Sequence, residues 1–330
     1  MKIIEVIADS GHTDTITSIA EKNKCLDVWA NPPNEDGRQI VRMIVSPKER
    51  QDVLDALQSV LGTSENARIN VIPLEVTLPR LTEEEEEQDK KNITTTREEL
   101  YNTIEKGSYL DGNFLLLVFL STIVAAIGLI EDNVAVIIGA MVIAPLLGPN
   151  IALALATALG DTELMWKSLQ TNLVGIIFAV SVTAIIGFFW PGELDSRELM
   201  TRTDVGLDGV VLALASGAAA VLSLTTGLPS VLVGVMVAVA LLPPAATMGL
   251  MLGQGHFELM SGAGLLLAVN IVCVNLSAKI VMLVKGVRPR TWLEKRKARQ
   301  STTAYILLWV ISLAILVTVI IIRGDILFIP

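Results

Sequence analysis

The chain has 330 residues, of which 52% are apolar and 18% are charged, and its mean hydropathy is +0.59. A soluble enzyme of this length would not carry several apolar runs long enough to span a membrane, about 20 residues in a helix, so the composition excludes that class. The net charge is −9, yet residues 285–299 hold seven Lys or Arg and one Glu. This uneven distribution of charge along the chain indicates membrane orientation rather than a charged partner.

Residues 1–80 are predicted to form a small α/β domain of the ferredoxin-like type. Its elements are expected in the order βαββαβ, with strands at 2–8, 25–30, 39–45 and 67–78 and helices at 13–22 and 47–61. The first residues, Met1–Glu5, show no signal-peptide pattern. We therefore expect this domain to stay in the cytoplasm.

Four residues between the first strand and the first helix form a candidate regulatory site: Ser10, Gly11, His12 and Thr13. A glycine turn before a helix N-terminus can bind an anion through free backbone amides. Helix capping alone also explains these residues, so both interpretations stay open.

Residues 81–108 are predicted to be an acidic linker followed by a short polar helix on the membrane surface. Glu83–Glu87 is a run of five acids, and such a run repels itself and stays solvated. The helix is expected over residues 94–107, with Thr96 as a candidate cap.

Seven membrane-spanning helices are predicted in residues 109–325. Their expected positions are 114–130, 134–158, 168–189, 208–225, 229–252, 260–284 and 304–322. If the N-terminal domain is cytoplasmic, the basic stretch 285–299 also falls inside, as the positive-inside rule requires. The expected fold is therefore a multi-pass α-helical membrane protein with a cytoplasmic N-terminus.

An internal repeat relates two parts of this region at an offset of 95 residues. Residues 136–165 and 231–260 align without a gap, and 12 of the 30 positions are identical. Each repeat unit would contain three spans, in residues 114–189 and 208–284. An odd number of spans reverses the second copy, so we expect two inverted repeats, an architecture recurrent in secondary transporters. The helix at 304–322 lies outside them.

Helix-breaking clusters stand at matching places in the middle helix of each repeat: Pro145, Gly148, Pro149 and Asn150 in the first copy, and Pro243 and Pro244 in the second. Proline removes a backbone donor and frees a carbonyl, which membrane depth tolerates only inside protein or beside water. We expect both breaks to line a substrate or ion pathway, with packing kinks as the alternative. Asn150 would either bind the solute or cap the restarting half-helix. Re-entrant hairpins would instead leave five spans and parallel repeats.

The segment Gly139–Asp161 (GAMVIAPLLGPNIALALATALGD) resembles the signature of a prokaryotic membrane family known as domain of unknown function 389, the uncharacterised hydrophobic domain proteins. The resemblance covers residues 110–285, and the N-terminal domain is similar to one that often accompanies it. It implies a protein of the bacterial or archaeal cell (inner) membrane. It carries over no substrate and no functional residue.

Polar side chains inside the predicted spans are further candidates for the pathway. Asn172 lies in the third span of the first half, and Asn270 and Asn275 lie in that of the second. Hydrogen bonding between helices is the alternative role. Lys279 is the one cation well inside an apolar stretch, and near the cytoplasmic end it can extend to the interface.

These features predict transport of an ion or small solute through a site between two proline-broken helices, gated by the cytoplasmic N-terminal domain. The alternative is a sensor or scaffold that transports nothing and binds a ligand through that domain. Cys25, Cys273, His12 and His256 show no metal-ligand spacing, and no catalytic triad or phosphate-binding lysine loop is present. We expect no enzyme activity, no cofactor, no metal and no nucleic-acid partner. Small residues at 213–220 favour close packing, and we expect a homo-oligomer in the lipid bilayer.

Overall fold

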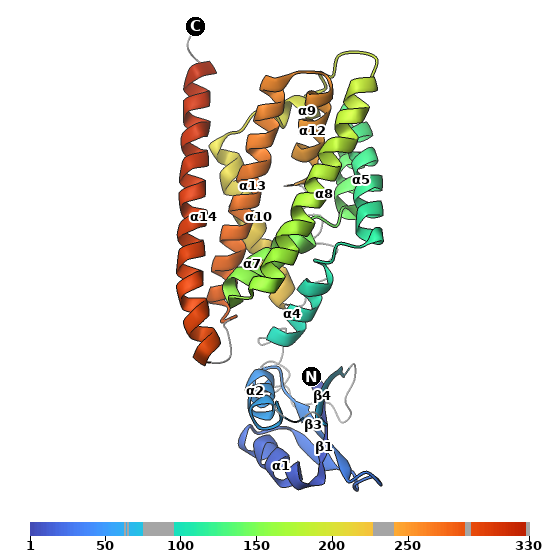
Figure 1. The fold of residues 1–330 in the computed structure, drawn as a ribbon, viewed down its shortest axis with the longest axis vertical. Helices are drawn as coiled ribbons and strands as arrows, with labels where there is room; N and C mark the ends of the chain where they lie inside the picture. Colours follow the sequence, from blue (N-terminus) through green and yellow to red (C-terminus); the bar gives the residue numbers. More distant parts are fainter. Residues whose placement is uncertain (63, 65, 75–95, 227–240, 288–291, 328–330) are drawn as a thin grey trace, which may run out of the picture. The chain divides into compact units, whose positions relative to one another are not determined.

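The computed structural model describes the chain except at residues 63, 65, 75–95, 227–240, 288–291 and 328–330. It divides into two compact units, Met1–Arg97 and Glu98–Pro330, and Figure 1 labels most of their elements. The acidic run expected in the linker lies outside the described residues.

The N-terminal unit is a four-stranded antiparallel sheet with two helices. Its elements follow the predicted βαββαβ order: β1 (Lys2–Asp9), the short 3-10 helix η1 (Ser10–His12), α1 (Thr13–Lys22), β2 (Asp27–Ala30), β3 (Arg38–Val45), α2 (Arg50–Leu61) and β4 (Arg68–Pro73). The strand order is β2-β3-β1-β4, with β1 paired to both β3 and β4. This is the element order of the ferredoxin-like arrangement.

One face of the sheet packs against both helices and forms the core of this unit. Alternate residues of β1 and β3, such as Ile4, Val6 and Met43, are fully buried, as the two-residue period of a strand requires. Ile16 of α1 and Leu57 of α2 pack against them. The apolar stripes of the two helices therefore face a single sheet surface.

The other face of the sheet carries a polar cluster on its central strands. Arg42 of β3 donates to the Glu5 carboxylate of β1 at 2.8 Å, and Asn70 of β4 donates to it at 3.1 Å. The hydrogen bonds from Arg42 and then Asn70 lower the pKa of Glu5 below its usual value. This cluster joins three neighbouring strands.

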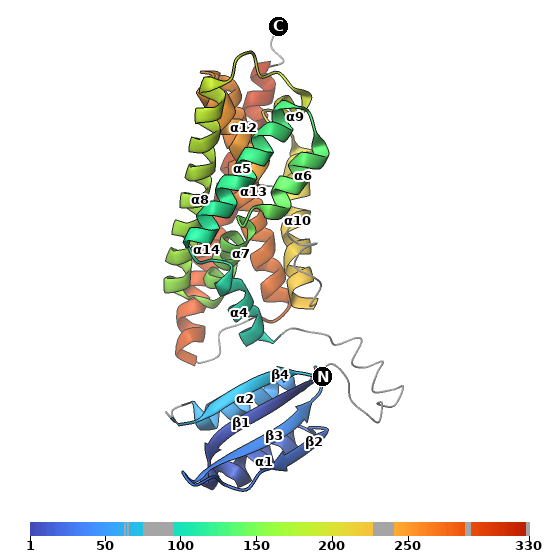
Figure 2. The ribbon, with the colours of Figure 1, turned by 90° about the vertical axis from the view of Figure 1, so that its right-hand side faces the viewer.

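The second unit is helical. Its described helices are α4 (Arg97–Lys106), α5 (Gly112–Ile130), α6 (Val134–Ile143), α7 (Leu147–Leu159), α8 (Thr162–Phe189), α9 (Arg197–Thr201), α10 (Leu207–Thr226), α12 (Leu242–Gly253), α13 (Phe257–Val284) and α14 (Trp292–Leu327). Figure 2 shows α5, α6 and α8 on one side of the bundle.

Five of these helices are long and apolar enough to cross a membrane: α5, α8, α10, α13 and residues Tyr305–Arg323 of α14. α6 and α7 pass the same test only as a pair, which is bent by 53° at its break, so the described residues supply up to six spans. The first half of the span expected at 229–252 lies outside the described residues, which show only α12 in the second half. The total of seven spans stays a prediction.

Two helices begin earlier than predicted. α8 begins at Thr162 rather than at 168 because the Asp161 side chain accepts hydrogen bonds from the amides of Glu163 and Leu164 and caps it. α14 begins at Trp292, inside the stretch expected to be a basic loop. Residues 293–300 are rich in Leu, Lys, Arg, Glu and Ala, which favour a helix.

The helix bounds recur along the unit at the offset found in the sequence. α8 and α13 each have 28 residues, and both of their ends lie 95 residues apart. α7 and α12 begin 95 residues apart, and so do α5 and α10. Gly160 and Gly255, in the turns before α8 and α13, have φ of 74° and 78°, a conformation that glycine favours.

The two sets of helices run in opposite directions. In Figure 1, α5 and α8 run upward whereas α10 and α13 run downward. α14 runs opposite to α13, because Arg323 near its end contacts Ser261 near the start of α13.

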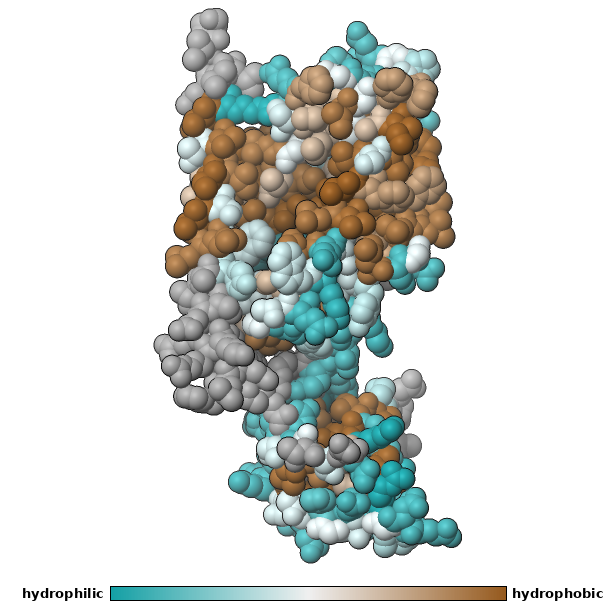
Figure 3. All heavy atoms as spheres, in the orientation of Figure 1, coloured by the Kyte–Doolittle hydropathy of each residue, from teal (hydrophilic) through white to brown (hydrophobic). Residues whose placement is uncertain are grey.

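Apolar side chains cover the outside of the helical unit. Figure 3 shows them as a broad band over the helices, with polar residues above it. Ile177, Phe188, Val211 and Ile322 are each more than half exposed. A band of this kind is expected where lipid, rather than water, surrounds the helices.

Candidate functional site

The break between α6 and α7 comprises residues 144–146. Ala144 has φ −66° and ψ 121°, an extended conformation that ends α6 at Ile143. Pro145 is half-buried within the break. The next helix starts at Leu147, so Gly148 and Pro149 belong to its first turn.

The first proline cluster coincides with a break in the helix, where the α6–α7 pair bends by 53° and Pro145 lies between the two helices. Pro149 stands in the first turn of α7, and Pro243 and Pro244 stand in the first turn of α12. A proline is tolerated there because amides of the first turn have no partner within the helix. Residues 227–240, where the second break is predicted to start, lie outside the described part of the chain.

Three asparagines from different helices meet beside this break. Asn150 of α7 accepts through Oδ1 from Asn172 Nδ2 of α8 at 3.3 Å and from Asn275 Nδ2 of α13. Asn275 also donates to the backbone carbonyl of Ile271 at 2.9 Å. Asn150 and Asn275 are fully buried, and Asn172 is 4% exposed.

The sequence predicts two alternative roles for Asn150, solute binding or helix capping. The structure excludes capping. No side chain caps the start of α7, whose cap residue is Leu146. Asn150 is the fourth residue of the helix, and its carbonyl oxygen faces two neighbouring helices instead. Asn172 and Asn275 thus belong to the site together with Asn150.

Asn270 does not join this cluster. It lies five residues before Asn275 on α13, which places it about 140° around the helix axis. It is buried on that other side.

Several buried polar atoms of the helical unit, two of them in the asparagine cluster, lack hydrogen-bond partners among the described residues. They include Asn150 Nδ2, Asn275 Oδ1, Thr247 Oγ1 and Lys279 Nζ. Lys279 is fully buried, and its ammonium lies 5.1 Å from the centre of the Tyr305 ring of α14. The sequence analysis allowed Lys279 to extend to the interface, but in the structure its side chain is buried.

Helix α4 packs directly on the first turn of α7. A Cβ added at Gly148 would lie 2.8 Å from the carbonyl carbon of Gly107 and 3.1 Å from its Cα, so the two backbones touch. Leu100 and Ile104 of α4 are buried in one apolar cluster with Ile151 and Leu155 of α7. The predicted surface helix is therefore attached to the restarting half-helix.

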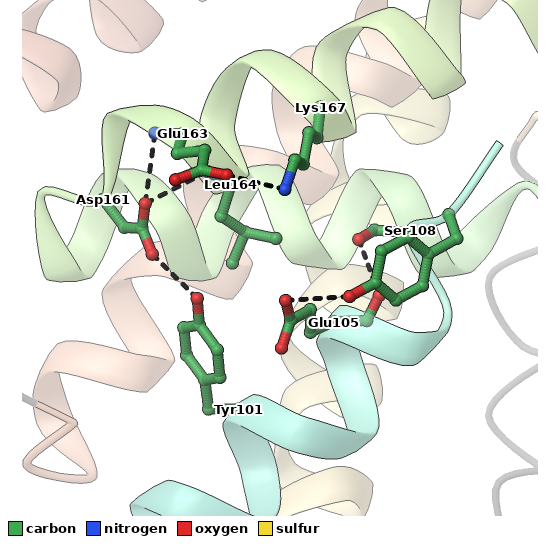
Figure 4. Close-up of polar contacts among 8 residues, drawn as sticks. Tyr101, Glu105, Ser108, Asp161, Glu163, Leu164 and Lys167 are labelled. Carbon is green, nitrogen blue, oxygen red and sulfur yellow. Dashed lines mark hydrogen bonds and ion pairs between the residues drawn. The ribbon is translucent and has the colours of Figure 1, made fainter.

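Polar contacts fix α4 to the turn between α7 and α8 as well. Figure 4 shows the Tyr101 hydroxyl pointing to Asp161, to which it donates at 2.8 Å. Burial and then the Asp161 carboxylate raise the pKa of Tyr101 above its usual value. Ser108, after α4, accepts through its backbone carbonyl from Thr171 of α8 at 2.9 Å.

The candidate regulatory residues of the N-terminal unit lie at the junction of β1 and α1. Ser10 and Gly11 are exposed, while His12 and Thr13 are half-buried. The Ser10 amide donates to Gly37 at 3.0 Å, and Thr13 Oγ1 donates to Gln39 at 2.8 Å. His12 precedes α1 without a side-chain capping bond, so side-chain capping does not explain this segment, and a ligand there stays a prediction.

Sequence reasoning missed two features of the site. It paired neither Gly107 with Gly148 nor Lys279 with Tyr305, because both contacts depend on how distant helices pack. Matching glycines at the end of one helix and the start of another were the available signal. Among the described residues no group of His, Cys, Asp and Glu could hold a metal ion.

Comparisons with known proteins found one family model and one archaeal relative. Residues 141–276 match the family model described as "Domain of unknown function (DUF389)". The chain is 37% identical over 294 residues to "Uncharacterized protein MJ0678" of Methanocaldococcus jannaschii, covering 89% of this chain and 91% of that protein. No solved structure matches the chain significantly. With its family signature and near full-length similarity to that archaeal protein, the chain belongs to the DUF389 family.

Proposed function

We propose that the protein transports an ion or small solute across a prokaryotic cell membrane. The observation that carries this proposal is the set of unpartnered polar atoms buried among apolar helices at the α6–α7 break. Buried polar groups are almost always hydrogen-bonded, and leaving one unpaired costs about 1–3 kcal/mol. A helix that served only as an anchor would gain nothing from such groups, whereas a solute could pair with them.

In this proposal the helical unit is an inverted repeat. The recurrence of helix bounds at 95 residues and the opposite directions of the two sets support it. The bend of 53° between α6 and α7 supports a broken span over a hairpin, because a re-entrant hairpin would reverse the chain. Solute sites of such transporters lie beside broken helices near the membrane midplane.

The N-terminal unit acts as a cytoplasmic gate in the same proposal. Residues 75–95 join it to α4, and α4 touches the first turn of α7 at Gly148. A movement of α4 would therefore act directly on the half-helix that carries Asn150. The basic stretch at 285–299 supports a cytoplasmic position for this end of the bundle.

Thiol accessibility tests whether the polar centre meets water. In a background with Cys25→Ala and Cys273→Ala, Asn150→Cys is compared with Ala154→Cys, one turn later on α7. Both positions are fully buried, but Ala154 belongs to an apolar cluster. Small charged methanethiosulfonate reagents should modify the cysteine at 150 and spare the one at 154.

Flux into proteoliposomes tests transport itself, using sodium, potassium, chloride and acetate as probes. The double variant Asn150→Leu/Asn275→Leu removes the two fully buried asparagines and leaves the Asn172 amide without its acceptor. Gly139→Ala on the exposed side of α6 is the control. Flux in the wild type and control, lost in the double variant, is the expected result. No flux and equal modification at both cysteines would leave the sensor or scaffold as the function.

A further inference from the structure

We propose that the polar centre formed by Asn150, Asn275 and Lys279 binds a small monovalent anion. This inference rests on the proposed function, since it names the class of solute for the same site. It specifies that the solute is negatively charged and that Lys279 supplies the opposite charge.

Lys279 supplies the positive charge. Of the described residues in the helical unit, it is the one charged side chain that is buried, and it is fully so. No carboxylate forms an ion pair with it in the part of the chain that the structure describes, and Nζ has no hydrogen-bond acceptor there. Its contact with the Tyr305 ring, 5.1 Å away, is a cation–π interaction that leaves the ammonium donors unused.

Such a lysine is costly in an apolar bundle without a counter-charge. Charged side chains within membrane segments pair with one another or mark the path of a solute. Removing an ion from water costs several kcal/mol, and an opposite charge with good hydrogen bonds offsets that cost. A cation would be repelled by the ammonium, so an anion is the solute that this centre favours.

Asn150 supplies a directed hydrogen-bond donor, and Asn275 holds it in place, because the Asn275 amide donates to Asn150 Oδ1 and to the Ile271 carbonyl. Asn275 and Lys279 are four residues apart on α13 and therefore share one face of the helix. Asn150 Oδ1 already accepts two bonds, which fixes the amide so that Nδ2 remains as a free donor. The free donors are Asn150 Nδ2 and the Lys279 ammonium, which also carries the one positive charge. This set matches a halide or a carboxylate, while a divalent anion would keep one charge unpaired.

The test is the thermal midpoint of the full-length protein in detergent, followed by tryptophan fluorescence. Sodium acetate and sodium chloride are the probes, sodium sulfate at equal ionic strength is the reference, and the acetate and chloride arms distinguish a carboxylate from a halide. At an anion concentration 100-fold above Kd, the midpoint should rise by roughly 5–10 °C for a unit of this size. Salt effects unrelated to the site are removed by subtracting the shift of a variant.

Lys279→Met is that variant, and Lys285→Met, at an exposed lysine beyond the end of the same helix, is its matched control. Lys279→Met should lose the shift with acetate and chloride, and without these anions it should melt no lower than the wild type, because an unpaired buried charge has been removed. Lys285→Met should keep the shift. Asn150→Asp is a second variant, since its carboxylate would pair with Lys279 and abolish the anion effect while keeping the acceptor.

The inference is overturned if neither acetate nor chloride shifts the wild type relative to sulfate, or if Lys279→Met shifts as the wild type does. A Lys279→Met protein that melts well below the wild type in sulfate would also overturn it, because the lysine would then be a structural group. Flux of sodium or potassium without a midpoint shift by acetate or chloride would refute this inference and still support transport. A midpoint shift by these anions without any flux would support anion binding at this centre and refute transport.

Discussion

Replacing Gly148 by alanine is expected to separate α4 from the first turn of α7. The new Cβ would overlap the Gly107 oxygen and lie 2.8 Å from its carbonyl carbon. These atoms are backbone, which cannot swing aside as the end of a flexible side chain can. The two helices must therefore move apart, and the packing of Ile104 in the apolar cluster that contains Ile151 weakens.

The magnitude follows from two opposing effects. Forcing an extra carbon into a packed contact costs about 1–3 kcal/mol. Alanine is favoured over glycine inside a helix by about 0.5–1 kcal/mol. The net loss is about 1–2 kcal/mol, which lowers the thermal midpoint by about 2–8 °C in a unit of this size.

The assay is thermal unfolding of the purified protein in detergent, together with limited proteolysis around residues 97–108. Gly139→Ala is the control, because a Cβ at that position meets no atom within 4 Å. The control should be unchanged or slightly more stable, and α4 should become more sensitive to protease in Gly148→Ala alone. Equal midpoints and equal cleavage in the two variants would refute the close approach of α4 and α7.

Three further changes test other contacts. Tyr101→Phe removes the bond to Asp161 and costs about 0.5–1 kcal/mol at pH 8, reduced for solvent screening. Because the folded-state pKa of Tyr101 is raised, this stabilisation is present below the unfolded value of about 10 and lost as pH rises through the folded value, so thermal midpoints of wild type and variant should converge in alkali. Glu5→Gln should lower stability by about 0.5 kcal/mol at pH 7; the lowered pKa makes this contribution disappear as pH falls through the folded value, so pulse proteolysis should show no difference near pH 2. Asn150→Ala leaves two buried amide donors without their shared acceptor and should cost about 1–3 kcal/mol in thermal unfolding, whereas a gap between variant and wild type near zero would contradict the network.

Local sequence patterns determined much of the fold. Helix α1 begins and ends where its apolar spacing predicts, at Thr13 and Lys22. The starts of α8 and α14 were missed because hydropathy does not register a polar first turn. Asp161 caps α8 although the residues after it are polar, and the helix propensity of residues 293–300 extends α14 beyond its apolar part.

The candidate site was predictable only residue by residue. Each asparagine was recognisable as a polar group inside an apolar span, but nothing local indicates which helices bring such groups together. The hydrogen bonds of Asn150 with Asn172 and Asn275 depend on the packing of α7 against α8 and α13. The same packing decides that Lys279 meets Tyr305 rather than an exposed surface.

The two sets of helices related by the 95-residue offset differ where the polar centre lies, and this difference bears on the proposed mechanism. At the offset of 95 residues, the polar centre corresponds to an apolar set, with Asn150, Asn275 and Lys279 matching Ala245, Val180 and Ala184. The α8–α12 contact that holds this apolar set is tight, since a Cβ at Gly249 would lie 3.0 Å from Thr183 Cβ. The two contacts therefore differ: the α8–α12 contact has apolar residues where the α7–α13 contact carries two amides and an ammonium. Buried amides and an ammonium without a counter-charge cost stability. Under the proposed function, a solute at the α7–α13 contact would offset that cost, and the α8–α12 contact, which lacks these groups, would need no solute.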